Sequence, residues 1–170
     1  MGESSVYKKF EDLLRDLKNT SRLSVTEETE EGEEVSEKYL IFNVGKESFA
    51  LPVKQLKEVL PDKQIIPVPG APPSVHGVIN YNNHILPVTN VHHLLRIPYK
   101  GSNGSYLLVV KDDKFKTALL IDGVVDLVDV RQKDVKPKIL RPVEYIDRMI
   151  AGEIYYKDKL ATLFNLAGID

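Results

Sequence analysis

Cysteine and tryptophan are both absent from this chain of 170 residues. Without cysteine it can form no disulfide, no thiolate nucleophile and no thiolate metal site, which excludes thiol redox chemistry. No apolar run reaches the roughly eighteen residues that a membrane span needs, and the charged N-terminus lacks the apolar stretch of a signal peptide. We therefore expect a cytoplasmic protein with no direct membrane insertion.

An excess of charge of either sign is also missing, because 23 basic residues face 25 acidic ones and the formal net charge is -2. No global positive field gathers phosphates, so we expect protein partners and no nucleic acid. Small β-barrels do host enzymes and nucleic-acid binders, which is the alternative from another class. The absence of tryptophan and of a basic aromatic face disfavours it.

The first 37 residues differ in character from the rest. Apolar residues at helical spacing between positions 6 and 18 predict a short amphipathic helix, which is marginal alone and must dock on something. They are Val6, Phe10, Leu13, Leu14 and Leu17. The glutamate-rich stretch that follows predicts a flexible solvated linker, with an acidic tail for basic targets as the alternative. We expect residues 1–37 to form this helix and linker, and residues 38–170 to form the body.

Short strand patterns punctuated by glycine, proline and asparagine fill the body. Residues 39–44 and 49–53 predict one hairpin, and residues 75–81 and 85–89 predict another. Five prolines between positions 61 and 73 exclude a central strand there. Strand, charged turn and strand then recur after position 105. The pattern predicts an all-β protein of barrels or a sandwich, and not a parallel α/β sheet.

The second half of the body repeats the first at an offset of 75 residues. The matched pairs are Gly77 and Gly152, Ile79 and Ile154, Tyr81 and Tyr156, Ile85 and Leu160, and Asn90 and Asn165. We interpret this repeat as two small barrels, one built by each half of the body.

Residues with catalytic or metal-binding potential do not assemble into a known pattern. His92 and His93 are adjacent, so on a helix they point about 100° apart, which is poor chelate geometry. The segment Gly101 to Gly104 precedes a strand and lacks the signature of a phosphate loop. Asp112 and Asp113 are typical of a hairpin turn. We therefore expect no enzyme, no cofactor and no metal site.

Three segments resemble the CheW family of bacterial chemotaxis coupling proteins: YLIFNVGKESFALPVKQLKEVL (39–60), PVPGAPPSVHGVIN (67–80) and ILPVTNVHHLL (85–95). In the second half, ALLIDGVVDLV (118–128) and LATLFNLAGI (160–169) look like the family's later strands. The resemblance implies an all-β fold of two packed five-stranded SH3-like barrels with short helices. It also implies an adaptor that links chemoreceptors to the histidine kinase CheA without catalysis.

The same resemblance implies where partners bind. Family members bind the regulatory domain of CheA through a barrel surface and the cytoplasmic tip of chemoreceptors in a groove between the barrels, at membrane-associated receptor arrays. Leu56 and Glu58 match positions that the family uses for partner contacts. Gly77, Val78 and Asn80 do so too, and the glycine would permit close approach of a receptor helix.

One departure from the family pattern lies directly after Asn80. The family usually continues with Leu-Arg-Gly, whereas this chain has Tyr81, Asn82 and Asn83, so Asn82 replaces an arginine that supports receptor coupling. One interpretation is that the two asparagines simply make a better hairpin turn. The other is a specialised scaffold in a different signalling assembly, with an altered receptor or with an extra partner bound through the N-terminal helix.

Overall fold

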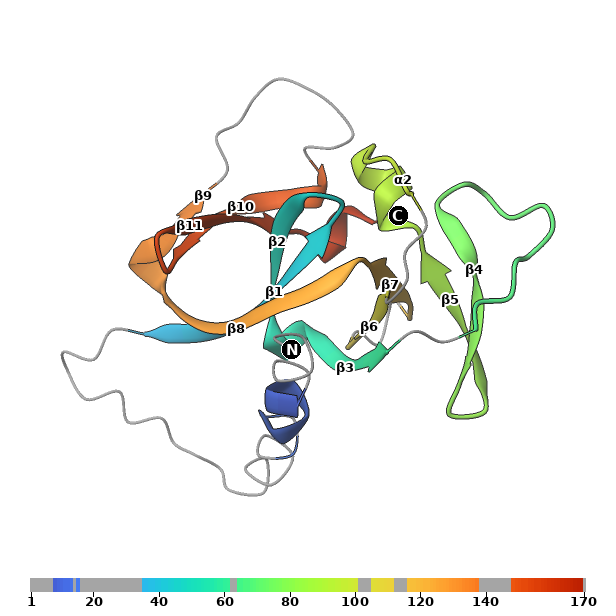
Figure 1. The fold of residues 1–170 in the computed structure, drawn as a ribbon, viewed down its shortest axis with the longest axis horizontal. Helices are drawn as coiled ribbons and strands as arrows, with labels where there is room; N and C mark the ends of the chain where they lie inside the picture. Colours follow the sequence, from blue (N-terminus) through green and yellow to red (C-terminus); the bar gives the residue numbers. More distant parts are fainter. Residues whose placement is uncertain are drawn as a thin grey trace.

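The computed structural model describes residues 8–13, 15, 35–61, 64–100, 105–111, 116–137 and 148–169. In these residues strands dominate and form two curled sheets, which lie beside each other in Figure 1. The first sheet, which we call barrel 1, has the strand order β8-β1-β2-β11-β10-β9. Its strands are β1 (Ser36–Val44), β2 (Glu47–Pro52), β8 (Gly123–Arg131), β9 (Val135–Pro137), β10 (Ile150–Tyr156) and β11 (Lys159–Phe164).

The second sheet, barrel 2, has the order β3-β6-β7-β5-β4. Its strands are β3 (Leu56–Pro61), β4 (Val75–Tyr81), β5 (His84–Thr89), β6 (Tyr106–Val110) and β7 (Ala118–Ile121). Short helical elements connect the strands: η1 (Val53–Gln55), α2 (Val91–Leu95), η2 (Gln132–Asp134) and η4 (Leu166–Gly168). The expected all-β fold of two barrel subdomains is confirmed, with sheets of six and five strands among the described residues.

The assignment of one barrel to each half of the body is wrong. Barrel 1 takes β1 and β2 from the start of the body and β8 to β11 from its end, while barrel 2 uses the strands between them. The chain thus leaves barrel 1 at η1 and returns at Asp122. A sequence repeat identifies two similar hairpins, but it does not say which other strands pair with them.

The repeat itself is present in the structure as the hairpins β4–β5 and β10–β11. Each hairpin has a register shift at its start, between Val75 and Gly77 in one and between Ile150 and Gly152 in the other. Each also ends in a parallel pairing, β5 with β7 and β11 with β2. The 75-residue offset therefore relates two whole supersecondary units and not only a few similar residues.

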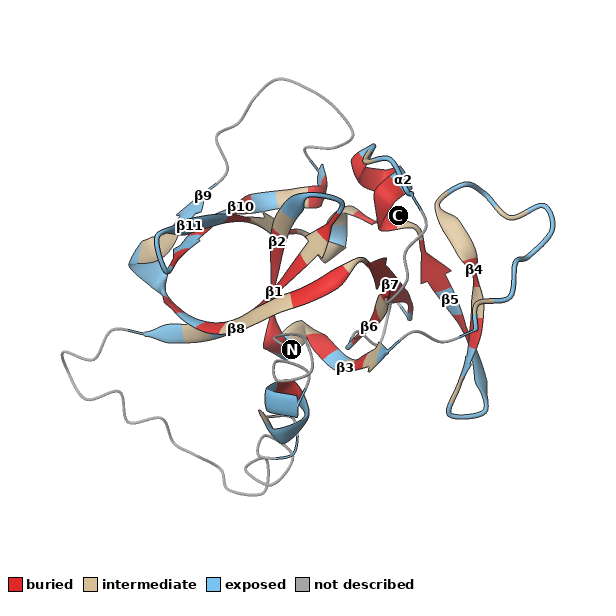
Figure 2. Ribbon diagram, viewed as in Figure 1, coloured by how far each residue is buried: buried red, intermediate tan, exposed pale blue. Residues whose placement is uncertain are grey.

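Buried residues, which are the red segments of the ribbon in Figure 2, form three apolar layers through side chains that alternate along the strands. Tyr39 and Ile41 of β1 point into barrel 1, whereas Leu40, Phe42 and Val44 point toward barrel 2. The layer between the barrels is the largest, and we call it the inter-barrel core. Its buried members are Phe10, Leu40, Phe42, Val44, Phe49, Leu51, Val53, Leu56, Val59, Val91, Leu94, Leu95, Leu108, Val110, Leu119, Ile121, Val124, Met149, Phe164 and Ile169.

The interior of barrel 2 forms a separate layer around Ile79, Leu86 and Val88. Because each large apolar side chain stabilises the fold by about 1.5–3 kcal/mol when fully buried, the inter-barrel core makes the two barrels one folding unit. The barrels therefore hold a fixed relative orientation. A binding surface that contains residues of both barrels requires such a fixed orientation.

The N-terminal region is described only in part. Residues 8–13 and 15 are helical, in the position where the sequence predicts a helix. Phe10 is fully buried in the inter-barrel core, and Leu13 packs against that core. The predicted acidic linker lies outside the described residues. No helix in the described part of the chain is long and apolar enough to cross a membrane.

Candidate partner-binding surfaces

The outward side of the β4–β5 hairpin carries an exposed apolar surface. Val78 lies opposite Pro87 in the strand register, and Asn80 lies opposite Ile85, so these side chains share one face. Ile66 joins the same face because it forms an isolated β-bridge with Val78. Ile85 is 79% exposed and Ile66 is 55% exposed. We call these five residues the hairpin surface.

An exposed apolar face with polar residues at its margin is typical of a protein interaction site. Two residues singled out from the sequence, Val78 and Asn80, lie on the hairpin surface. Its most exposed apolar side chain, Ile85, was not among the candidates. Successive side chains of a strand point to opposite faces, and Leu86, directly after Ile85, is buried. This alternation is the sequence signal that marks Ile85 as outward-facing.

Glu58 lies at the seam where barrel 2 is open, between its two edge strands β3 and β4. The Tyr81 hydroxyl donates a hydrogen bond of 2.5 Å to Oε2 of Glu58, and Nζ of Lys57 lies 5.5 Å from the centre of the Tyr81 ring. Burial, the hydrogen bond to Glu58 and the charge of Glu58 together raise the pKa of Tyr81 to about 12, while a hydrogen bond with Asn82 opposes the rise. Tyr81 therefore holds Glu58 in place beside the hairpin.

Two of the candidate residues are interior. Leu56 is only 2% exposed and belongs to the inter-barrel core, so its side chain is not available to a partner. Gly77 is buried as well, and a Cβ built there would lie 2.5 Å from the carbonyl oxygen of Ile66 and 2.7 Å from Cγ2 of Ile65. The chain's own segment at Ile65 and Ile66 thus makes a close approach to Gly77.

The tip of this hairpin explains the pair of asparagines. Asn82 and Asn83 have φ values of 48° and 64°, which is the positive φ that both central residues of a type I′ turn need. Asparagine tolerates this left-handed conformation better than most side chains, arginine included. The backbone alone therefore gives a physical reason for Asn82, which supports the turn interpretation.

The β10–β11 hairpin exposes apolar side chains at the repeat-equivalent positions. Tyr155 and Leu160 lie opposite each other in the register and are 45% and 46% exposed. The Nζ atom of Lys136 lies 4.7 Å from the centre of the Tyr155 ring. At the 75-residue offset these two residues correspond to Asn80 and Ile85. Each barrel thus has an exposed apolar side chain at the equivalent position of its repeated hairpin, Ile85 in one and Leu160 in the other.

A hollow of about 270 Å³, which we call the inter-barrel hollow, lies where elements of both barrels meet. Pro52 and Gln55 line it from the crossing at η1, and Lys111 lines it from the end of β6. The remaining lining residues are Ala151, Leu163, Phe164, Asn165, Leu166 and Ala167. The backbone N–H of Lys111 donates to the Gln55 carbonyl, so this edge of the hollow is fixed by the fold.

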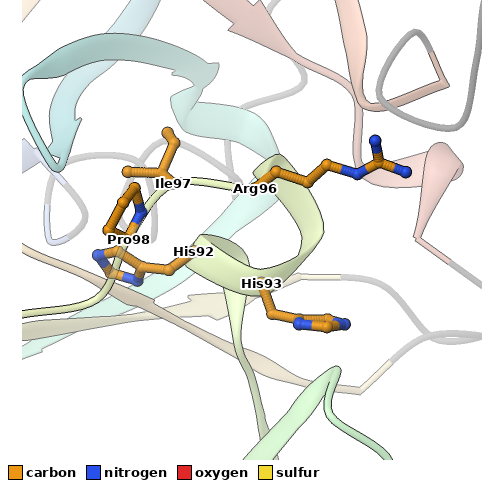
Figure 3. A pocket seen from close by; sticks show the side chains of 5 residues that line it. All are labelled: His92, His93, Arg96, Ile97 and Pro98. Carbon is orange, nitrogen blue, oxygen red and sulfur yellow. The ribbon is translucent and has the colours of Figure 1, made fainter.

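Two of the four histidines, His76 and His92, belong to one structural cluster around Tyr99. Figure 3 shows that His92 and His93 diverge from one turn of α2 beside a shallow hollow of about 640 Å³, which Arg96, Ile97 and Pro98 also line. His92 is 2% exposed, and its Nε2 lies 2.7 Å from Oδ2 of Asp122. Since Asp122 stands at the return crossing between the barrels, His92 anchors α2 at that crossing.

His76 and Tyr99 extend the same cluster. The Tyr99 ring lies edge-on to His76 and His92, with ring centres 5.4 Å and 4.9 Å away. Burial lowers the pKa of His76, and the nearby His92 lowers it further. No three His, Cys, Asp or Glu side chains lie close enough together to hold a metal ion within the described ranges.

Comparison with known proteins gives one consistent result. Residues 38–169 match the family model of the CheW-like domain. The chain is 28% identical to the chemotaxis protein CheW of Treponema pallidum over 120 residues, which cover 64% of this chain and 69% of that protein. It is 23% identical to CheW of Klebsiella aerogenes over 111 residues, which cover 62% of this chain and 64% of that protein. The chain thus spans about two thirds of these relatives.

A solved structure agrees with these matches. The scaffolding protein CheW of Thermoanaerobacter tengcongensis superposes with a TM-score of 0.71 at 25% sequence identity, and the alignment covers 78% of this chain and 90% of that one. The match to the family model extends over most of the chain and includes both barrels. The chain therefore belongs to the CheW-like family of chemotaxis coupling proteins.

Proposed function

We propose that the chain is an adaptor that binds the regulatory domain of CheA and the cytoplasmic tip of a chemoreceptor, and that it performs no catalysis and needs no cofactor. In this proposal it works in the cytoplasm at receptor arrays. Residues 38–170 form the binding body, and residues 1–37 form a helix and a linker. The exposed apolar hairpin surface on a rigid double barrel is the observation that carries the proposal.

The hairpin surface is the proposed site for the kinase domain. Val78, Asn80 and Ile85 supply an apolar centre with a polar neighbour, and Glu58 lies at the adjoining seam. Interfaces of this kind concentrate their affinity in a few central apolar side chains, with charged residues at the rim. Leu56 and Gly77 are interior and make no direct contact in the proposal.

The inter-barrel hollow is the proposed site for the receptor tip. It lies on a different part of the molecule, lined by residues of β11 and η4 and by Gln55 of η1. An adaptor needs two separate surfaces, since each interface must bury enough area for specificity without covering the other.

Calorimetric titration of the full chain with a CheA regulatory domain tests the kinase arm. Ile85→Asp changes an exposed side chain, so the fold should persist, while binding should weaken at least about tenfold because a charge enters the centre of the interface. Leu160→Asp is the matched control, because Leu160 is the repeat-equivalent exposed position on barrel 1. Equal affinity of Ile85→Asp and the unchanged protein would show that the kinase binds elsewhere.

A specialised scaffold with an altered receptor is the second candidate function. The observation that favours it is the neutral Asn82 at the position of the family's arginine. In this candidate the usual receptor contact includes the hairpin turn in addition to the inter-barrel hollow. Asn82→Arg would restore the charge at that turn, and its effect on binding a receptor-tip coiled coil separates the two candidates. Unchanged receptor affinity supports the plain adaptor, whereas a gain of about tenfold or more would show that this chain has lost the usual receptor contact.

A further inference from the structure

The N-terminal helix places one of its faces inside the molecule and leaves the other in solvent. Phe10 is 0% exposed and is a member of the inter-barrel core, with Leu13 packed against the same core. Lys8, Lys9 and Glu11 are exposed on the same helix. The helix therefore contacts the body through an apolar face with anchors three residues apart.

An electrostatic interaction accompanies the apolar contact. Burial tends to raise the pKa of Asp126 in β8, but hydrogen bonds from Lys157 and from the Leu127 N–H, together with the positive charges of Lys157 and Lys9, lower it overall. The charge of Lys9 therefore acts on a carboxylate of barrel 1. Phe10 of the same helix reaches the core that both barrels share.

The helix is attached to the body by a long tether in the sequence. Residues 16–34 separate it from the first described residue of the body, Val35. A chain segment of that length can reach on the order of 60 Å when fully extended, so the covalent connection does not force the helix into this position. A helix this short is also marginal alone, which means that its docking depends on the contacts of Phe10 and Leu13.

We propose that the place occupied by Phe10 and Leu13 is a helix-binding groove, and that the helix carrying these two residues fills it as an internal ligand which a partner's amphipathic helix can displace. The displacing helix would carry a large apolar anchor, a leucine three residues later and a basic residue directly before the anchor. Amphipathic helices bind apolar grooves through anchors with this spacing. Only the identification of that helix as a signalling partner rests on the adaptor function proposed above.

The tether makes the internal ligand an effective competitor. A covalently attached segment acts at an effective concentration that the length of its connection sets, so a partner must bind well to replace it. The groove is therefore closed to weak ligands and open to a helix that matches its chemistry.

A synthetic peptide of residues 5–18, carrying a fluorescent label, tests the groove in trans. We expect it to bind the full chain with Phe10→Ala at least tenfold more tightly than the unchanged chain, because the internal ligand no longer competes. The chain with Glu11→Ala is the matched control and should behave like the unchanged chain, since Glu11 is exposed on the helix. The peptide with its own Phe10→Ala change should not bind.

Equal, weak binding of the peptide by a folded Phe10→Ala chain would overturn the proposal, because Phe10 would then be a fixed core residue. If that chain fails to fold, amide hydrogen exchange of the Lys9→Glu chain tests whether the helix separates from the body. The Lys8→Glu chain is the control. Faster exchange of residues 8–15 in Lys9→Glu alone, with an unchanged body, supports a separable helix. Amide exchange that speeds up in the helix and the body alike, in both variants, would overturn the proposal. Neither experiment contains a kinase or receptor, so failure here leaves the adaptor proposal untouched.

Discussion

The hairpins β4–β5 and β10–β11 share one backbone design and differ in the chemistry at their tips. Both turn through two residues of positive φ, Asn82 and Asn83 in barrel 2 and Lys157 and Asp158 in barrel 1. Both are followed by an asparagine that accepts a hydrogen bond from a helical N–H: Asn90 from His93 and Asn165 from Ala167. The conserved geometry lies in the backbone and the caps.

The seams of the two barrels show the difference. In barrel 1, Nζ of Lys157 lies 2.7 Å from Oδ2 of Asp126 on the strand across the seam. In barrel 2 the corresponding turn residue is the neutral Asn82, and Tyr81 makes the contact across the seam, with Glu58. The contact across the seam is therefore made by the ammonium group of Lys157 in barrel 1 and by the phenol hydroxyl of Tyr81 in barrel 2. Although the turn has no arginine, the seam of barrel 2 keeps a contact, because Tyr81 donates a hydrogen bond to Glu58.

The largest expected effect separates core from surface within β3. Leu56→Ala should lower the free energy of unfolding by about 2–5 kcal/mol, because it opens a cavity in the inter-barrel core. Glu58→Ala, two residues away and partly exposed, should cost about 1 kcal/mol or less. Urea unfolding followed by circular dichroism measures both. Similar losses from the two changes would mean that Leu56 is not a core residue.

The turn of barrel 2 gives the next largest effect. Asn82→Ala should lower the free energy of unfolding by about 1 kcal/mol, because alanine has a Cβ and no side-chain hydrogen bond to support the left-handed conformation. Asn82→Gly should be close to neutral, since glycine adopts positive φ without strain. Thermal unfolding of the two variants tests the interpretation, which fails if alanine and glycine behave alike.

The seam contact of barrel 2 should also be measurable through Tyr81. Tyr81→Phe should cost about 1 kcal/mol, the usual contribution of one hydrogen bond. Since the folded-state pKa of about 12 lies above the ordinary value of 10.0, this group's contribution is present below pH 10 and is lost as pH rises toward 12. Ultraviolet titration should therefore lose its highest-pH tyrosine step in Tyr81→Phe. Persistence of that step would assign it to another tyrosine.

The smallest expected effect concerns the histidine cluster beside barrel 2. The pKa of His76 is lowered from 6.5 in the folded protein, first by burial and then by His92. The unfolded chain therefore binds a proton more readily, and stability should fall as pH drops below about 6.5. His76→Gln should reduce this dependence slightly in unfolding experiments between pH 7.5 and pH 5.5. An unchanged slope would show that other groups cause the acid sensitivity.

Much of the fold could be predicted from the sequence because strand alternation and turn residues act locally. The hairpin at Asn82, the helix that holds Phe10 and the 75-residue repeat all follow from short-range patterns. The division of strands between the barrels depends on the parallel pairings of β5 with β7 and of β11 with β2, which join distant segments. Local patterns contain no information on those pairings, so the assignment by halves was wrong.

The candidate surface shows the same limit. A family motif marks positions, but it does not distinguish a side chain that contacts a partner from one that supports the surface. Leu56 and Gly77 proved to be interior, whereas Val78 and Asn80 face outward. Ile85 could have been found from its phase relative to Leu86, but the contact of Tyr81 with Glu58 joins residues 23 positions apart and needs the fold.

The central claim is that one rigid body with two separate surfaces binds two proteins at once. Sedimentation velocity of the full chain mixed with a CheA regulatory domain and a receptor-tip coiled coil tests it most directly. The account predicts a ternary complex heavier than either binary one, with Ile85→Asp removing only the kinase domain from it. Two binary complexes that compete with each other, and no ternary species at saturating concentrations, would contradict the account.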